Sequence, residues 1–462
     1  MVERAFPVLF AALAILVVLP WVQAYRRDKL DVFSPTLYKS LFVAIGGVDL
    51  YNRVYLEERQ IFREVSIEFE EGFALILGLE TTLFAAFLAG YYLMRERPIQ
   101  SRVFTSPDLT RTILLKAIAV LYILAGSVFY VLALYSTIGT DFFYLYQTTT
   151  PRSQLFSGSY IYTAGASMLY LGYFLYLVAL LAERRLPNIF ELAFLPVIMG
   201  MFFLFGGRAT TYLIGLTAGV ILYYGIILNQ AETDSWVITK FRGAHPLMQL
   251  SVVPILAILV GLGGLVAGAM RGARTVGEAV ADVSPIDALT VFSQPRAPDN
   301  FLLLMDVVPE EIGYYYGSFY IRVFTFFIPR SVWEGKPVSY NGSFLGRIAL
   351  PDQSGGRPAG EIGEYYLNFG LPGIPLIAFV YGMLMRITYA TLRGNCISPI
   401  AVLIYALIIT SIGNTGLQNL VLTTLVRDLI VLSPALLIHT AIAHRGEQYY
   451  SSMAAIKRYV MR

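Results

Sequence analysis

Residues 72–94 read GFALILGLETTLFAAFLAGYYLM, and a single acidic side chain, Glu80, interrupts an otherwise uncharged run. As an α-helix, this run is long enough to cross the roughly 30 Å hydrocarbon core of a bilayer. Arg95 and Arg97 follow directly, and positive charge in short loops is typical of the cytoplasmic side. The stretch therefore predicts a membrane-spanning helix whose C-terminal end faces the cytoplasm.

The composition of the whole chain supports a membrane protein. Of its 462 residues, 56% are hydrophobic and 14% are charged, and the mean hydropathy is +0.63. A soluble protein of this size could not bury so much apolar surface, whereas a bilayer removes that need. The net charge of +3 is too small to indicate a nucleic-acid partner, and a single cysteine excludes a disulfide framework and a multi-thiolate metal site.

Ten further apolar runs give about eleven predicted spans in all. They are 5–24, 36–52, 112–136, 158–183, 187–206, 209–228, 248–270, 365–386, 397–413 and 420–443. The run 36–52 contains Lys39 and Asp49, but it must span because the basic segments 24–29 and 95–111 both read as cytoplasmic. The first run is read as an uncleaved helix, because its basic pair follows the run. We therefore expect one all-α polytopic membrane domain over 1–462, with its N-terminus outside and its C-terminus inside.

The polar segment 271–361 is predicted to lie outside the cytoplasm, although it is rich in basic residues. These are Arg271, Arg274, Arg296, Arg322, Arg330, Lys336, Arg347 and Arg357. A basic outer loop runs against the usual charge bias, and an anionic ligand would explain it. Within it, the aromatic stretch 309–330 is too short and too polar to span, which favours a helix lying along the membrane interface or an ordinary packed loop helix.

Three arginines are candidates for binding an anion on the outer side: Arg208, Arg330 and Arg427. Guanidinium keeps its charge and grips phosphate oxygens in a bidentate manner. Each has a structural alternative. Arg208 would snorkel to headgroups, Arg427 would pair with the neighbouring Asp428, and Arg330 would bind lipid phosphate without specificity.

Two carboxylates, Glu361 and Glu364, lie where the outer loop returns to the membrane. At a spacing of three they share one face of a helix. An apolar boundary raises the basicity of a carboxylate, so that it can take a proton from a sugar hydroxyl. The alternative is that both acids stabilise a helix N-terminus. The sequence predicts no metal site and no cofactor.

Several short motifs resemble the Wzy-type O-antigen or oligosaccharide repeat-unit polymerases. They are Gly206-Gly207-Arg208-Ala209-Thr210, Phe327-Ile328-Pro329-Arg330 with Trp333 and Lys336-Pro337, Gly363-Glu364-Tyr365 with Asn368-Phe369-Gly370, Asp31-Val32-Phe33-Ser34-Pro35, and Arg427-Asp428. Some members of that family carry an Arg-x10-Gly motif in each of two outer loops. Arg208 and Gly219 match this spacing, whereas Arg330 and Gly342 are one residue further apart.

The resemblance implies a GT-C-like glycosyltransferase of the bacterial inner membrane with a periplasmic active site. Its substrates would be oligosaccharides on undecaprenyl pyrophosphate, as donor and as acceptor, with membrane lipid and a chain-length regulator as further partners. The side chains described above supply matching parts, and we expect Arg208, Arg330, Glu364 and Glu361 to be catalytic. We expect Arg208, Arg330, Lys336, Arg427 and Arg274 to bind pyrophosphate, and Trp333, Tyr316 and Tyr320 to contact lipid or sugar.

Three other functions compete with the polymerase. An O-antigen ligase uses the same donor but relies on a histidine in its large outer loop, and segment 271–361 contains no histidine. A flippase or transporter of lipid-linked sugar should distribute charge along many helices and often shows repeated halves. A scaffold of an envelope complex would keep polymer synthesis intact when single arginines are replaced.

Overall fold

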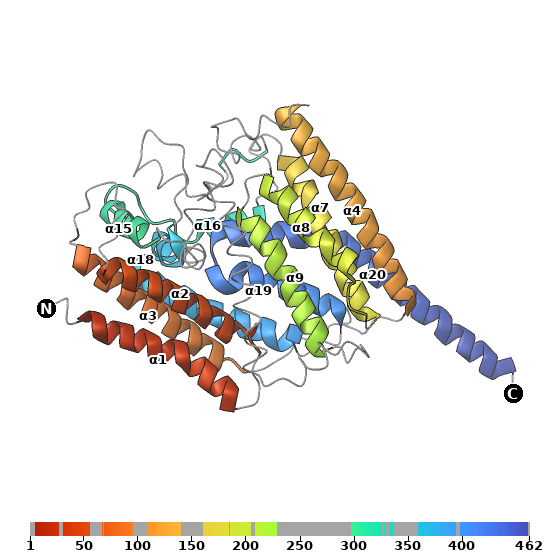
Figure 1. Cartoon of the computed structure of the whole chain (residues 1–462), viewed down its shortest axis with the longest axis horizontal. Helices are drawn as coiled ribbons and strands as arrows, with labels where there is room; N and C mark the ends of the chain where they lie inside the picture. Colours follow the sequence, from red (N-terminus) through yellow and green to blue (C-terminus); the bar gives the residue numbers. More distant parts are fainter. Residues whose placement is uncertain are drawn as a thin grey trace. The chain divides into compact units, whose positions relative to one another are not determined.

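The computed structural model shows a helical protein (Figure 1). It describes residues 5–26, 31–55, 67, 69–95, 109–139, 160–183, 185–204, 208–228, 297–325, 328, 332–335, 359–393 and 398–460. The chain divides into two compact units. Unit 1 comprises Met1–Ile99, Ala244–Thr391 and Ile408–Val426, and unit 2 comprises Gln100–Gly243, Leu392–Leu407 and Arg427–Arg462.

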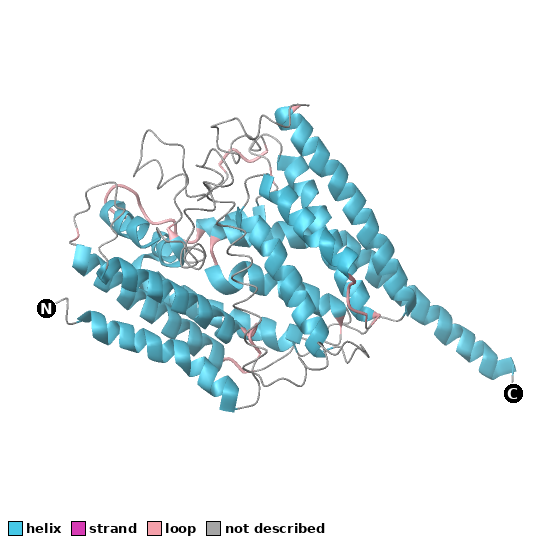
Figure 2. Ribbon diagram, viewed as in Figure 1, coloured by secondary structure: helices cyan, strands magenta, loops and turns pink. Residues whose placement is uncertain are grey.

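All regular structure in the described residues is helical, and no strand is drawn there (Figure 2). The helices are α1 (Ala5–Arg26), α2 (Pro35–Tyr55), α3 (Phe69–Leu93), α4 (Leu109–Ile138), α7 (Tyr160–Ala182), α8 (Ile189–Leu204), α9 (Arg208–Leu228), α15 (Ala297–Val307), α16 (Ser318–Thr325), α18 (Gly360–Thr388), which continues into a π-helical turn (Tyr389–Arg393), α19 (Pro399–Thr415) and α20 (Asn419–Val460). Six of these helices contain stretches that are long and apolar enough to cross a membrane: Ala5–Arg26, Glu70–Leu93, Thr112–Thr137, Ala164–Ala182, Gly360–Leu392 and Asn419–His439. The protein is therefore a helical, multi-pass membrane protein.

Each predicted span coincides with a helix, except for 248–270, which lies outside the described residues. Shorter apolar helices occupy Ile189–Phe202, Thr210–Gly225 and Pro399–Gly413. The count of about eleven spans and their orientation stay predictions, because the structure contains no membrane.

In unit 1, α3 packs closely along α18, and glycines on both helices allow the approach. A Cβ at Gly90 of α3 would lie 2.0 Å from the backbone oxygen of Phe379 on α18. In the opposite direction, a Cβ at Gly382 of α18 would lie 2.1 Å from the backbone oxygen of Phe87 on α3. Small residues that let two backbones touch are typical of helix pairs in membranes. The helices α1 and α2 contact each other and α3 (Figure 1).

In unit 2, α4 and α7 form the corresponding pair. A Cβ at Gly126 of α4 would lie 2.2 Å from the backbone nitrogen of Leu169 on α7. On α7, a Cβ at Gly172 would lie 2.9 Å from the backbone oxygen of Ala119 on α4. Both units therefore use small residues at the contact of their central helices.

The described part of segment 271–361 differs from the prediction in two respects. It contains α15, a short apolar helix that packs against α18 and whose Phe301, Leu302, Leu303 and Leu304 are buried. The aromatic stretch predicted as a helix over 309–330 becomes helical only at Ser318, and α16 ends at Thr325. The residues before Ser318 form a turn with positive φ at Tyr316 and Gly317, and its amides bind α18, as described below.

Candidate active site

Glu361 lies on the first turn of α18 and Glu364 follows three residues later, and both carboxylates contact the turn that joins α19 to α20. The Tyr365 hydroxyl donates to Glu361 Oε1 over 2.9 Å and accepts from the Leu417 N–H over 3.0 Å. The Asn419 N–H donates to Glu364 Oε2 over 2.7 Å. The shared helix face that the sequence predicts is thus the face that holds this turn.

Glu361 is the centre of a buried ion pair. Lys39 of α2 donates to Oε2 of Glu361, and the side chains of the two residues are 4% and 11% exposed. Because Tyr365 takes Oε1, both oxygens of Glu361 are engaged. A buried pair of this kind depends on both partners, since either one alone would be an uncompensated charge. Glu361 therefore joins α2 to α18 and to the turn after α19.

Gly416 ends α19 in the left-handed conformation, with φ +66. Its N–H donates to the Ile412 carbonyl over 2.9 Å, which is the hydrogen bond of a left-handed helix C-cap. A Cβ on Gly416 would lie 2.1 Å from Oε1 of Glu361. Both the backbone angle and the contact with the carboxylate therefore require glycine here.

Glu364 is 5% exposed and stabilises the N-terminus of α20. Stabilisation of a helix N-terminus was the alternative role predicted for this acid. Glu364 belongs to α18, but the N-terminus that it stabilises is that of α20. No hydrogen bond from the residues that the structure describes reaches Glu364 Oε1. A buried carboxylate held through one oxygen can accept a proton on the other.

The tyrosine turn, residues 314–317, docks on a kink in α18. The helix departs from helical geometry at Phe369 and Gly370, and Pro372 has no N–H to donate back to the Asn368 carbonyl. The turn supplies the missing donors: the Tyr315 N–H binds the Leu367 carbonyl and the Tyr316 N–H binds the Asn368 carbonyl, both over 2.9 Å. The positive φ angles of Tyr316 and Gly317 lie outside right-handed helical geometry, so α16 begins only after them, at Ser318.

Two fully buried asparagines connect Glu364 to this turn and to the start of α16. Asn368 donates through Nδ2 to the Glu364 carbonyl over 2.8 Å and accepts from the Gly317 N–H over 3.0 Å. Asn419 donates its N–H to the Glu364 carboxylate and its Nδ2 to the Phe319 carbonyl. Each asparagine thus holds Glu364 with one group and the segment 317–319 with another.

Tyr320, predicted to touch lipid or sugar, lies next to this group with its hydroxyl buried. No residue that the structure describes forms a hydrogen bond with that hydroxyl. Burial, reinforced by the negative charges of Glu364 and Glu361, raises the pKa of Tyr320. The phenol therefore stays protonated, and it offers a hydrogen-bond donor.

Arg427 lies in unit 2, where it pairs with its neighbour. Its Nη2 lies 2.8 Å from Asp428 Oδ1 and donates to the Tyr170 hydroxyl over 3.0 Å. Tyr170 in turn donates to Asp428 Oδ2 over 2.7 Å. This closed triangle is the ion pair that the sequence offered as the structural alternative for Arg427.

The other predicted anion-binding residues have no described side chains. Arg330, Lys336 and Arg274 lie outside the described residues, and Arg208 is described only as the first residue of α9. The predicted sugar-contacting side chains of Tyr316 and Trp333 are 74% and 37% exposed. Within the described ranges, no three histidine, cysteine, aspartate or glutamate side chains gather as a metal site. The predicted pyrophosphate site therefore stays a prediction.

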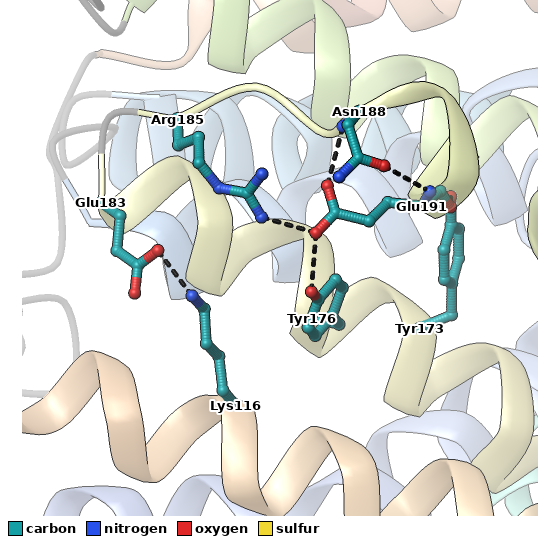
Figure 3. A network of polar contacts seen from close by, with 7 residues as sticks. All are labelled: Lys116, Tyr173, Tyr176, Glu183, Arg185, Asn188 and Glu191. Carbon is teal, nitrogen blue, oxygen red and sulfur yellow. Dashed lines mark hydrogen bonds and ion pairs between the residues drawn. The ribbon is translucent and has the colours of Figure 1, made fainter.

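A second polar network in unit 2 joins α7 to α8 (Figure 3). Asn188 and Glu191 form a capping box, with Glu191 N–H donating to Asn188 Oδ1 over 2.9 Å and Asn188 N–H to Glu191 Oε2 over 2.7 Å. Arg185 and Tyr176 both donate to Glu191 Oε1, and the hydrogen bond raises the pKa of Arg185. The network fixes the entry into α8, a structural role.

Sequence reasoning missed three residues that build the site: Lys39, Asn368 and Asn419. Lys39 counted only as an argument against a span over 36–52, yet a lysine within an apolar run is itself a sign of a buried partner. Asn368 entered only as part of a motif. Asn419 offers no signal in a single sequence, because its role depends on where α20 begins.

Comparison with family models, with curated proteins and with solved structures finds no match for the chain. Membership of the Wzy-type family thus stays a prediction from short motifs.

Proposed function

We propose that the protein is a polysaccharide polymerase that joins oligosaccharide repeat units carried on undecaprenyl pyrophosphate at the periplasmic face of a bacterial inner membrane. A hydroxyl of the incoming lipid-linked unit attacks the anomeric carbon of the growing glycan. The bond from that carbon to the pyrophosphate oxygen breaks, and the lipid pyrophosphate leaves with the electron pair. The attacking hydroxyl gives its proton to a carboxylate.

The observation that carries the proposal is the environment of Glu364. Its carboxylate is buried, held in one position through Oε2, and accepts no hydrogen bond from the described residues at Oε1. A general base needs this combination of a fixed position and an available oxygen. Glu361 fits the role less well, because Lys39 and Tyr365 engage both of its oxygens. We therefore assign the base to Glu364 and a positioning role to Glu361.

Charge developing on the departing pyrophosphate needs positively charged groups. We propose Arg208, Arg330, Lys336 and Arg274 for this role, on the chemistry of their side chains. Arg427 is a weaker candidate, because Asp428 already neutralises its charge. Trp333 and Tyr316, both exposed, are proposed to contact sugar or the polyprenyl chain.

The test is a reconstituted reaction with purified protein, lipid-pyrophosphate-linked repeat units and no nucleotide sugar, with the products separated on a gel. A ladder of increasing glycan length supports the polymerase. In Glu364→Gln the side-chain oxygen can still cap α20 but cannot take a proton, so we expect the ladder to disappear while the protein stays folded. Glu70→Gln, on the exposed first turn of α3, is the matched control and should leave the ladder unchanged.

Two outcomes would refute the proposal. If the wild-type protein yields no ladder but moves labelled lipid across a vesicle membrane, it is a transporter. If glycan passes to lipid A core instead of a second repeat unit, the protein is a ligase. A ladder that persists in Glu364→Gln would refute only the assignment of the base.

A further inference from the structure

Three aromatic side chains form a surface that we call the aromatic shelf: Tyr314, Tyr316 and Phe369. The rings of Tyr314 and Tyr316 lie 6.2 Å apart at 75°. The Phe369 ring lies against Gly317, where a Cβ would be 3.2 Å from Cζ. Tyr316 is 74% exposed and Phe369 is 40% exposed. The kink of α18 and the tyrosine turn therefore leave aromatic rings exposed on the protein surface.

The backbone of Tyr316 is held in a conformation that a tyrosine seldom adopts. Its φ is +45, in the left-handed region that favours glycine. The N–H groups of Tyr315, Tyr316 and Gly317 all bind Leu367 or Asn368 of α18, which fixes the turn. Non-glycine residues in this region cluster at binding sites, where the surrounding structure imposes the conformation. The direction in which the Tyr316 side chain leaves the backbone is thus set by these hydrogen bonds.

The same contacts fix the shelf relative to Glu364. Asn368 accepts from the Gly317 N–H and donates to the Glu364 carbonyl, so a single side chain binds both the tyrosine turn and the residue that carries the proposed base. Phe369 directly follows Asn368 in the chain. A ligand on the shelf would therefore be held at a fixed distance from the proposed base.

We propose that the aromatic shelf binds a pyranose ring of the lipid-linked acceptor and so orients its hydroxyl toward Glu364; this inference rests on the proposed function. The C–H face of a pyranose is apolar and packs on exposed aromatic rings, while its hydroxyls remain free for polar partners. The exposed acid Glu310 precedes the tyrosine turn, and its charge disfavours a phosphate at the shelf. A neutral sugar fits both the aromatic rings and the negative charge beside them.

A membrane surface is the other partner that exposed aromatic rings attract. Insertion among headgroups needs no fixed ring orientation, whereas Tyr316 keeps a strained backbone angle secured by hydrogen bonds. The adjacent Glu310 also repels anionic lipids. These observations favour the sugar.

The test measures binding of two probes by full-length protein in nanodiscs: the lipid-linked repeat unit of the producing organism, and the glycan released from it by mild acid. Tyr316→Ala and Tyr316→Gly should each weaken binding of the released glycan about tenfold, the factor that corresponds to one modest contact. In the polymerisation assay they should raise KM for the lipid-linked unit and also lower kcat, because the acceptor hydroxyl is no longer held toward Glu364. Tyr316→Trp keeps a ring and should bind as wild type.

The Tyr316→Gly variant removes the ring without straining the backbone, so it tests the role of the ring alone. Because glycine adopts positive φ without strain, Tyr316→Gly should fold at least as well as wild type. If Tyr316→Gly binds glycan with wild-type affinity, the ring has no role and the inference is wrong. Quenching of Tyr316→Trp fluorescence by brominated lipid, above that of the native tryptophans, would place the ring in the bilayer and also overturn it.

The outcomes keep the inference and the proposed function apart. If the wild-type protein forms a ladder and Tyr316→Ala binds glycan with unchanged affinity, the sugar-binding role of the shelf is refuted and the polymerase function is supported. If glycan binding depends on Tyr316 but the protein forms no ladder, the shelf is a carbohydrate-binding site and the polymerase function is refuted.

Discussion

Replacing Lys39 by methionine should destabilise the protein more than any other single loss of a lysine that the structure describes. Methionine keeps the length of the side chain but leaves the Glu361 carboxylate buried without its cation. Removing one partner of a buried ion pair costs about 3–5 kcal/mol. That is a large part of the roughly 5–15 kcal/mol that a folded protein typically has in total.

The size of the effect follows from burial. The side chains of Lys39 and Glu361 are 4% and 11% exposed, whereas Lys116 and Glu183, the matched pair in unit 2, are 29% and 23% exposed. Solvent screens the second pair, so Lys116→Met should cost no more than about 1 kcal/mol. The two substitutions make the same change in side chain and in charge, and they differ only in their surroundings.

The free energy of unfolding is measured for purified protein in mixed micelles, by titration with sodium dodecyl sulfate and circular dichroism. The double variant Lys39→Met with Glu361→Gln should recover much of the loss, because no charge is left unpaired. A coupling energy of about 2 kcal/mol or more is expected for residues in direct contact. The reasoning fails if Lys39→Met costs no more than Lys116→Met, or if the two losses at the buried pair simply add.

Three further substitutions test other parts of the structure. Gly416→Ala should cost about 1–2 kcal/mol for the left-handed backbone alone, and more through contact with Glu361; an unchanged thermal midpoint would contradict the C-cap geometry. Arg427→Met should cost about 3–5 kcal/mol and be rescued by adding Asp428→Asn; loss of polymer at unchanged stability would instead mark Arg427 as a ligand-binding residue. Asn188→Ala should cost about 1 kcal/mol, as measured by the same titration, because it removes a helix N-cap; no loss would mean that the capping box is not formed in solution.

The membrane spans were predictable because their signal is local. A run of about 20 apolar residues must be helical in a bilayer, where no water satisfies the backbone. Over 36–52 the structure confirms a helix, α2, but α2 is not among the described helices that are apolar enough to cross a membrane, so this span stays a prediction. Orientation depends on loop charges, and it stays a prediction.

The elements of segment 271–361 were less predictable because their partners lie far away in the sequence. The aromatic composition of 309–330 favoured one helix, but the amides of Tyr315 and Tyr316 bind carbonyls of α18 that a kink has freed. The kink itself was visible as Gly370 and Pro372. Nothing in the sequence indicated that another segment would supply the missing donors.

The sequence by itself determined the class of protein, the position of its apolar helices and the pair of carboxylates at the start of α18, because these depend on hydrophobicity and on helical spacing. The tertiary structure alone decided how the two acids differ. Glu361 meets Lys39 across 322 positions of the chain, and Glu364 meets the first amide of α20. A buried charge takes its role from the group that neutralises it, and that group is brought into contact only by folding.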